Sequence, residues 1–279
     1  MAQRKYYRKN KLSAKIKLSW LRFFFKTGGL IKTFLFLFFV FCFLFFVFII
    51  GLFAYFAKDL PNPEKLASRQ VVESTKIYDR TGTVLLYDIH TEEKRTVISF
   101  SQIPQSVKEA TLVIEDVNFY HHFGLDFKGI LRAFLANLRG KKIAQGGSTI
   151  TQQFIKNSFL TPERTLSRKI KEAILAIELE IKYPKDKIFE FYLNQIPYGS
   201  NAYGIEAASQ TFFGKKAQDL SLAESALLAA LPKAPSYYSP YGSHPEELKA
   251  RQEYILERMV KFGYLSQEKA EEAKKEKLN

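Results

Sequence analysis

Two adjacent carboxylates, Glu115 and Asp116, are the first residues in this 279-residue chain whose types suit catalysis. They follow an apolar helical stretch. Because neighbouring residues on a helix point in different directions, the two do not form a pair that shares one proton. One can therefore face a cleft while the other takes a structural role. A carboxylate beside apolar surface has its charged form disfavoured, so it can act as a base near neutral pH. The alternative is a helix end that carries two surface acids.

A run of small, hydroxyl and amide residues at 146–157 is the second feature, and it reads Gly-Gly-Ser-Thr-Ile-Thr-Gln-Gln-Phe-Ile-Lys-Asn. The β-branched Thr-Ile-Thr disfavours a core helix at that point. The run predicts instead a glycine-rich turn that leads into a helix start. Hydroxyls and free backbone N–H groups at such a start can face an anion.

A basic cluster follows the run. Its members are Arg164, Arg168, Lys169 and Lys171. Arg168 and Lys169 stand four and three residues before Glu172, so both can meet this acid on one helix face. Together with Lys156, several cations near a helix start suit a diphosphate. The alternative is a solvated face with weak surface salt bridges.

Metal-ligand patterns are weak in this chain. His121-His122 has no histidine or cysteine partner nearby at ligand spacing, so it gives little support for a metal site. The one cysteine, Cys42, lies in an apolar span. The part of the chain beyond that span therefore has no disulfide and no cysteine-based metal site.

The elements that must position these residues are mostly helical. Two short strands within 76–87, joined at 79–82, come first, with a third possible at 95–100. A helix from Ser106 then leads into Glu115. Its expected buried face consists of Val107, Ala110, Thr111 and Ile114.

Helix-end signals mark the later elements. Thr161 as a cap with Pro162 at the first helical position predicts a helix that ends near Lys182, before Pro184. A further helix is expected over 185–195. Ser221 and Glu224 form a capping box for a helix over 222–231. Two charged helices split at Gly263 occupy 245–277, and we assign no chemistry to them.

A helix over 124–140 has two interpretations. Apolar residues recur at helical spacing, while basic residues lie elsewhere on the wheel. The favoured interpretation is a stripe that faces the core, and the alternative is an interfacial helix lying on a membrane. The apolar residues are Phe127, Ile130, Leu131, Phe134, Leu135 and Leu138.

A membrane span is expected over 33–57, where no residue is charged. It is too long for a signal-peptide core and lacks a small-residue cleavage site. Ten Lys or Arg and no acid precede it, so we expect the N-terminus in the cytoplasm and the rest outside, at the plasma (inner) membrane. Beyond residue 32 the chain has 32 basic residues against 28 acids. Because that balance is nearly even, nucleic acid is not an expected partner, and the basic tail suits anionic lipid.

The ordered motifs resemble those of the family 51 peptidoglycan glycosyltransferases. Residues 115–124 are similar to the first motif, 146–157 to the second, and Arg168-Lys169 with Glu172 to the third. Residues 192–208 resemble the fourth and 223–235 the fifth, so the likeness runs from about 101 to 239. The resemblance implies a mainly α, lysozyme-like domain with a short β segment at its start, preceded by a single transmembrane helix. It also implies a smaller lobe pressed into the outer leaflet, which favours the interfacial interpretation of 124–140.

The reaction that the resemblance implies is polymerisation of lipid II into glycan strands. Glu115 would be the general base for the acceptor hydroxyl, and undecaprenyl diphosphate would leave with inversion. Glu172 would be the second carboxylate, arranging the donor site or helping to hold a divalent cation such as Mg²⁺ or Mn²⁺, although no cofactor is required. Implied partners are lipid II, the lipid-linked glycan chain, membrane lipid and other cell-wall synthesis proteins.

The candidate substrate-binding residues follow from the same motifs. They are Asp116, Phe119, His122, Gly147, Ser148, Thr149, Gln152, Gln153, Lys156, Asn157, Arg164, Arg168, Lys169, Asn194, Tyr198 and Gly199. Within the polar run, most of 146–153 is expected to build the helix start, and Lys156 is the expected diphosphate ligand.

Two members of the family fit the chain. One is a monofunctional transglycosylase, and the other is the N-terminal half of a class A penicillin-binding protein, whose entry segment resembles 74–82. Ser266-Gln267-Glu268-Lys269 is read as a helix cap, and the Lys-Thr-Gly at 26–28 precedes the span, so neither indicates a transpeptidase. We therefore expect a truncated class A protein. From other functional classes, a lytic glycan-cleaving enzyme and an inactive scaffold also fit the sequence, although less well.

The expected division of the chain has five parts. They are a basic cytoplasmic tail (1–32), a transmembrane helix (33–57), a connector with a short β segment (58–100), a glycosyltransferase core (101–240) and C-terminal helices (241–279).

Overall fold

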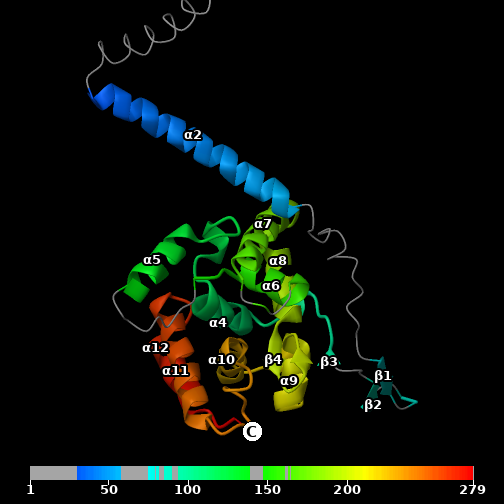
Figure 1. Cartoon of the computed structure of the whole chain (residues 1–279). Coiled ribbons are helices and arrows are strands. Elements are labelled where there is room, and N and C mark those ends of the chain that lie inside the picture. The colour runs from blue at the N-terminus through cyan, green and yellow to red at the C-terminus, as the bar shows by residue number, and fades with distance from the viewer. Residues whose placement is uncertain are drawn as a thin grey trace, which may run out of the picture. The chain divides into compact units, whose positions relative to one another are not determined.

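Two units make up the chain, residues 1–59 and residues 60–279. The computed structural model describes residues 30–57, 75–78, 80–81, 85–89, 94–138, 147–160, 163 and 165–278 (Figure 1). Residues 1–29 of the basic tail, most of the connector and Arg164 lie outside the described residues.

The first unit contains one long apolar helix, α2 (Leu30–Ala57). Its segment Lys32–Gly51 is long and apolar enough to cross a membrane, judged by length and composition. The described helix already includes Leu30 to Lys32, three residues before the expected start at Thr33.

The predicted hairpin at the start of the second unit is confirmed. Strand β1 (Thr75–Tyr78) pairs antiparallel with β2 (Leu85–Ile89). The third strand expected at 95–100 is wrong, because β3 covers only Lys94–Arg95 and pairs parallel with β5 (Ala202–Tyr203). A short 3₁₀ helix, η1 (Phe100–Gln102), follows it.

The side chain of Asn194 explains why the third strand stops early. Its Oδ1 accepts a hydrogen bond from the Ile98 N–H at 3.0 Å, and its Nδ2 donates to the Ile98 carbonyl at 3.0 Å. Both backbone groups of Ile98 are thereby satisfied without a neighbouring strand.

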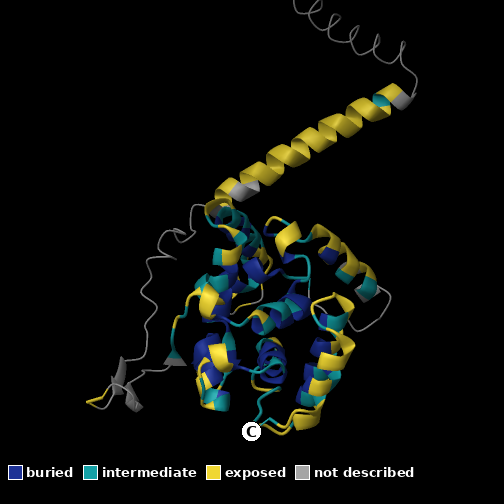
Figure 2. Ribbon diagram, turned by 180° about the vertical axis from the view of Figure 1, so that it is seen from behind, coloured by how far each residue is buried: buried dark blue, intermediate teal, exposed yellow. Residues whose placement is uncertain are grey.

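Helices α4 (Gln105–Glu115), α10 (Leu222–Ala230) and α11 (Pro245–Lys261) pack together as one group of the second unit. The expected buried face of α4 is confirmed, since Val107, Ala110, Thr111 and Ile114 are all buried. In α10 every residue after Leu222 is buried, and Figure 2 shows this helix in dark blue among the others. The carboxyl end of α4, which carries Glu115, is therefore fixed by a well-packed core.

Helices α6 (Ile150–Phe159), α7 (Leu166–Lys182) and α8 (Lys185–Gln195) form a second packed group. The predicted bounds of α8 are confirmed. The predicted start of α7 is wrong, because Thr165 caps it by accepting from the Arg168 N–H, and the expected cap at 161 lies outside the described residues.

The remaining elements complete the second unit. They are η2 (Phe119–His121), α5 (Phe127–Leu138), β4 (Pro197–Gly199), α9 (Ile205–Phe213), η3 (Ala217–Asp219), η4 (Leu231–Lys233) and α12 (Gln267–Lys275). The capping box of Ser221 with Glu224 at α10 is confirmed, as is the break between α11 and α12 at Gly263, whose φ is 78°.

The core-facing interpretation of the 124–140 helix is wrong. In α5 the side chains of Phe127 and Leu131 are 73% and 58% exposed, and Ile130 and Leu135 are exposed as well. The helix begins at Phe127 because the preceding Asp126 caps it, with Oδ1 accepting from the Gly129 N–H at 2.9 Å. The apolar stripe of α5 thus faces outward within the second unit.

Candidate active site

Glu115 is the last residue of α4, and its two carboxylate oxygens have different surroundings. Gln153 on α6 donates from Nε2 to Oε2 at 2.8 Å. Arg251 on α11 places Nη2 4.0 Å from Oε1, a distance too long for a hydrogen bond. Among the described residues we find no hydrogen bond to Oε1. The polar contacts of Glu115 differ from the apolar surroundings expected of a base, but they leave one oxygen able to take a proton.

Asp116 points away from Glu115, as expected for neighbours at a helix end. Its Oδ2 accepts from the Ile150 N–H at 3.1 Å and from His122 Nε2 at 2.9 Å. Ile150 is the first residue of α6, so Asp116 ties the start of α6 to the end of α4. Phe119 is fully buried and its ring meets that of His122 edge-on. The contacts of these three residues are thus internal, and their expected role in substrate binding stays a prediction.

The turn before α6 leads into a helix start, as the polar run predicts, and a capping box builds it. The Thr149 side chain accepts from the Gln152 N–H, and Gln152 Oε1 accepts from the Thr149 N–H. Thr149 Oγ1 also donates to the Gly124 carbonyl at 2.7 Å, where Gly124 has a φ of 72°. Both Thr149 and Gln152 are buried, so they orient the helix start.

Glu172 lies on α7 between two cations. Oε1 is 3.1 Å from Arg168 Nε, and Oε2 accepts from Lys169 Nζ at 2.7 Å. The Glu172 side chain is only 1% exposed, so the alternative of a surface salt bridge does not apply to this acid. Lys169 Nζ also donates to Ser148 Oγ at 2.8 Å, which links α7 to the turn before α6.

Lys156 and Asn157 are exposed on α6. Partial burial of the Lys156 ammonium lowers its pKa; Glu172 opposes this shift, while Arg168 and Lys169 add to it. The two basic residues and the acid of α7 therefore share an electrostatic environment with Lys156, as the basic cluster predicts. Arg164 lies outside the described residues.

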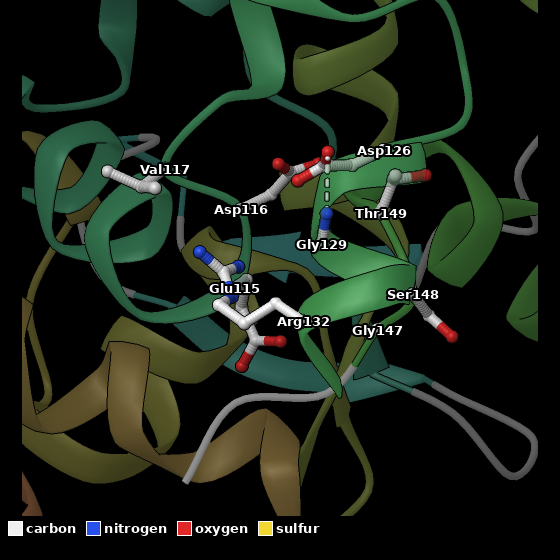
Figure 3. Close-up of a pocket in the computed structure, with 9 residues that line it drawn as sticks. All are labelled: Glu115, Asp116, Val117, Asp126, Gly129, Arg132, Gly147, Ser148 and Thr149. Carbon is white, nitrogen blue, oxygen red and sulfur yellow. Dashed lines mark hydrogen bonds between the residues drawn. The ribbon is translucent and has the colours of Figure 1, made fainter. Parts of the chain in front are cut away.

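A small cavity, partly open to solvent, lies between the end of α4, the start of α5 and the turn before α6 (Figure 3). In Figure 3 the Ser148 side chain points away from the carboxylates of Glu115 and Asp116. The cavity is lined by Glu115, Asp116, Val117, Asp126, Gly129, Arg132, Gly147, Ser148 and Thr149.

The contacts of Asn194, Tyr198 and Gly199 are internal to the fold. Asn194 holds Ile98 through its side-chain amide, and Tyr198 is fully buried. Burial raises the pKa of Tyr198, and the charge of Glu115 raises it further. Gly199 has a φ of 98°, and a Cβ there would stand 3.2 Å from the Pro235 carbonyl oxygen. Substrate contact by these residues stays a prediction.

Three residues at the site were missed by sequence reasoning. Asp126 and Arg132 line the cavity, and Arg251 faces Glu115 from a helix to which no chemistry was assigned. A signal for Arg251 does exist. It stands between Leu248 and Ile255 on the buried face of α11, a position where periodicity expects an apolar residue.

The divalent cation considered for Glu172 has little support from the donor set. Among the described residues there is no group of three or more His, Cys, Asp or Glu side chains that could hold a metal ion. Both oxygens of Glu172 already face Arg168 and Lys169. The charge of this acid is therefore offset by two side chains of its own helix.

The model of a protein family described as Transglycosylase matches residues 82–260. The chain belongs to this family. Penicillin-binding protein 1A of Aquifex aeolicus (strain VF5) is 51% identical over 216 residues, which cover 77% of this chain and 29% of the relative. Penicillin-binding protein 1F of Bacillus subtilis (strain 168) is 46% identical over 197 residues, 71% of this chain and 27% of the relative.

This transglycosylase domain is homologous to the N-terminal part of class A penicillin-binding proteins 1A and 1F. It spans less than a third of the length of those two curated relatives. A crystal structure of penicillin-binding protein 1A from Haemophilus influenzae aligns with a TM-score of 0.42 at 24% identity, covering 74% of this chain and 21% of that one.

Proposed function

We propose that this transglycosylase domain polymerises lipid II, with Glu115 as the general base. The observation that carries the proposal is the asymmetry of the Glu115 carboxylate. Gln153 fixes Oε2, whereas Oε1 has a cation at 4.0 Å and no hydrogen-bond donor among the described residues. A base needs this combination of a fixed orientation and a free lone pair.

The reaction is a single displacement. Oε1 of Glu115 takes the proton of the acceptor sugar hydroxyl as that oxygen attacks the anomeric carbon of the donor. The bond between this carbon and the diphosphate oxygen breaks, and undecaprenyl diphosphate leaves with the electron pair. One displacement inverts the anomeric configuration and requires no protein nucleophile.

Leaving-group stabilisation is assigned to Lys156, Arg168 and Lys169. Among the described residues near these three cations, Glu172 is the buried acid, and it fixes the orientation of Arg168 and Lys169. The remaining positive charge suits a diphosphate, whose developing charge is stabilised by fixed cations in a partly buried site.

Two segments of the chain, α2 and α5, are proposed to contact the membrane. Helix α2 has the length and composition of an anchor. From the basic residues that precede it, we infer that its N-terminus lies in the cytoplasm. The exposed apolar stripe of α5 suits the interface of the outer leaflet. A lipid-linked substrate would then reach the site without leaving the bilayer surface.

The test is product analysis with purified full-length protein in detergent and lipid II. Wild type and Glu109→Gln are expected to form glycan polymer, and Glu115→Gln is expected to form none. Glu109 is a matched control, because it lies on the same helix, away from the cavity, and accepts a hydrogen bond from Gln105. Degradation of finished glycan would support the lytic enzyme instead. Inactivity of wild type in both assays would support the scaffold.

A further inference from the structure

Arg251 is a buried arginine whose guanidinium connects two helix ends. It is 9% exposed, and its Nε donates to the carbonyl of Ala230, the last residue of α10, at 3.0 Å. Its Nη2 stands 4.0 Å from Oε1 of Glu115, the last residue of α4. The guanidinium carbon lies 5.3 Å from the centre of the Tyr238 ring.

This placement fixes the direction of the Arg251 charge. The guanidinium is planar, so a bond from Nε to Ala230 and a ring face at Tyr238 together set where Nη2 points. The carboxyl ends of α10 and α4 both carry partial negative charge, which a cation between them offsets. Burial lowers the pKa of Arg251, and Glu115 opposes that shift, as expected for a cation that faces a carboxylate.

The distance of 4.0 Å between Arg251 Nη2 and Glu115 Oε1 allows electrostatic attraction but is too long for a hydrogen bond. At this distance Nη2 attracts the Glu115 carboxylate but does not occupy a lone pair of Oε1. Gln153 already holds the other oxygen. The carboxylate is thus held by one hydrogen bond at Oε2 and attracted by one fixed cation near Oε1.

We propose that Arg251 is a positioning residue for Glu115, which helps to keep the carboxylate oriented while leaving Oε1 free to accept a proton. The proposal rests on the proposed role of Glu115 as the base. Arg251 itself does not touch the reacting atoms.

Other groups interact electrostatically with Glu115, but they differ from Arg251. Lys156 on α6 and Lys233 on η4 are long lysines whose partial burial lowers their pKa values, and both end in flexible ammonium groups. Tyr192 on α8 and Tyr198 on β4 have raised pKa values because of burial and the Glu115 charge, so they are neutral near pH 7. Arg132 lines the cavity on the side of α5.

Arg258 provides a matched control on the same helix. Its Nε donates to the Val113 carbonyl of α4 at 2.6 Å, and its guanidinium lies near the rings of Tyr254 and Phe262. It is thus a half-buried arginine with the same type of backbone contact as Arg251, but no contact with Glu115 is found among the described residues.

The first test measures kcat and KM for lipid II with the full-length protein. We expect Arg251→Met to lower kcat about 10- to 100-fold, because a displaced base loses its reacting geometry, while KM stays within about twofold. Arg251→Lys is expected to recover part of kcat. Arg258→Met is expected to keep the wild-type kcat when the rate is divided by the amount of folded protein. Equal losses of kcat in the Arg251 and Arg258 methionine variants, or a rise in KM alone, would overturn the proposal.

The second test needs no activity and therefore separates this inference from the proposed function. Carbodiimides modify carboxyl groups that the reagent can reach, so the labelling rate of Glu115, followed by peptide mass spectrometry, reports on how firmly its carboxylate is held. At one fixed pH we expect faster labelling of Glu115 in Arg251→Met than in wild type or Arg258→Met. If wild type fails to polymerise lipid II, the proposed function fails and this rate alone decides the inference. An unchanged rate in Arg251→Met would overturn it.

Discussion

Gln153 Nε2 donates a 2.8 Å hydrogen bond to Glu115 Oε2, and this contact joins two segments that lie 38 residues apart. Gln153 itself accepts from the Tyr192 hydroxyl, with 3.4 Å between the oxygens. Because Thr149 and Gln152 fix the start of α6, the Gln153 amide arrives at Glu115 in a defined orientation. The polar run therefore contributes to the site mainly by holding the carboxylate.

Removing this amide gives the first prediction. Gln153→Ala is expected to lower kcat about 10- to 100-fold, because a hydrogen bond to a charged group contributes about 1.5–3 kcal/mol. Initial rates of lipid II polymerisation measure the effect. Gln210→Ala is the control, since Gln210 donates to Glu206 on α9 and is expected to leave the rate unchanged. Equal rates for wild type and Gln153→Ala would contradict the assigned contact.

The pH dependence of diphosphate binding gives the second prediction. Because burial lowers the pKa of Lys156, its charge is lost at a lower pH than that of an ordinary lysine. As pH rises through that range, kcat/KM is expected to fall in wild type. Lys156→Arg keeps its charge, so its kcat/KM should persist to higher pH. A pH profile of the same shape in both proteins would remove Lys156 from the diphosphate site.

Gly204 gives a prediction about the fold. Its φ is 83°, and a Cβ there would stand 2.4 Å from the backbone oxygen of Asn194, the residue that holds Ile98. Gly204→Ala is expected to prevent folding or to lower the unfolding free energy by more than about 4 kcal/mol. Gly214 is the control, with a φ of 66° and no atom within 4 Å of a built Cβ. Gly214→Ala should cost only about 1–2 kcal/mol. Similar unfolding midpoints in urea for the two variants would contradict the close approach.

The exposed stripe of α5 predicts contact with lipid. The chain has a single cysteine, so Cys42→Ser allows one site at a time to carry an environment-sensitive dye. A dye at Leu131→Cys is expected to show blue-shifted emission in vesicles and quenching by spin-labelled lipid. The same dye at Lys249→Cys, a half-buried position on α11, is expected to show no blue shift and no quenching. Equal emission at both sites would contradict the interfacial assignment.

Local signals were sufficient for much of the fold. The bounds of α8, the helix start after the polar run and the capping box at Ser221 follow from residues close together in the sequence, and the structure confirms them. Neighbouring carboxylates on a helix end also had to diverge, as Glu115 and Asp116 do.

Contacts between distant segments were not predictable in the same way. Asn194 ends the expected third strand by binding Ile98, 96 residues away. Helical spacing identified the apolar stripe of α5, but it could not show whether that stripe packs against the core or is exposed. Arg251 reaches Glu115 only because α11 packs against α4, which no local pattern specifies.

The most direct test of the account is the rate of lipid II polymerisation by Glu115→Gln, measured beside Glu109→Gln. Glutamine keeps the shape of the side chain but cannot accept the proton as a carboxylate does. We predict that Glu115→Gln loses about 10²- to 10⁴-fold in kcat, the usual contribution of a general base, while Glu109→Gln keeps the wild-type rate. A Glu115→Gln rate close to that of Glu109→Gln would show that Glu115 is not the base.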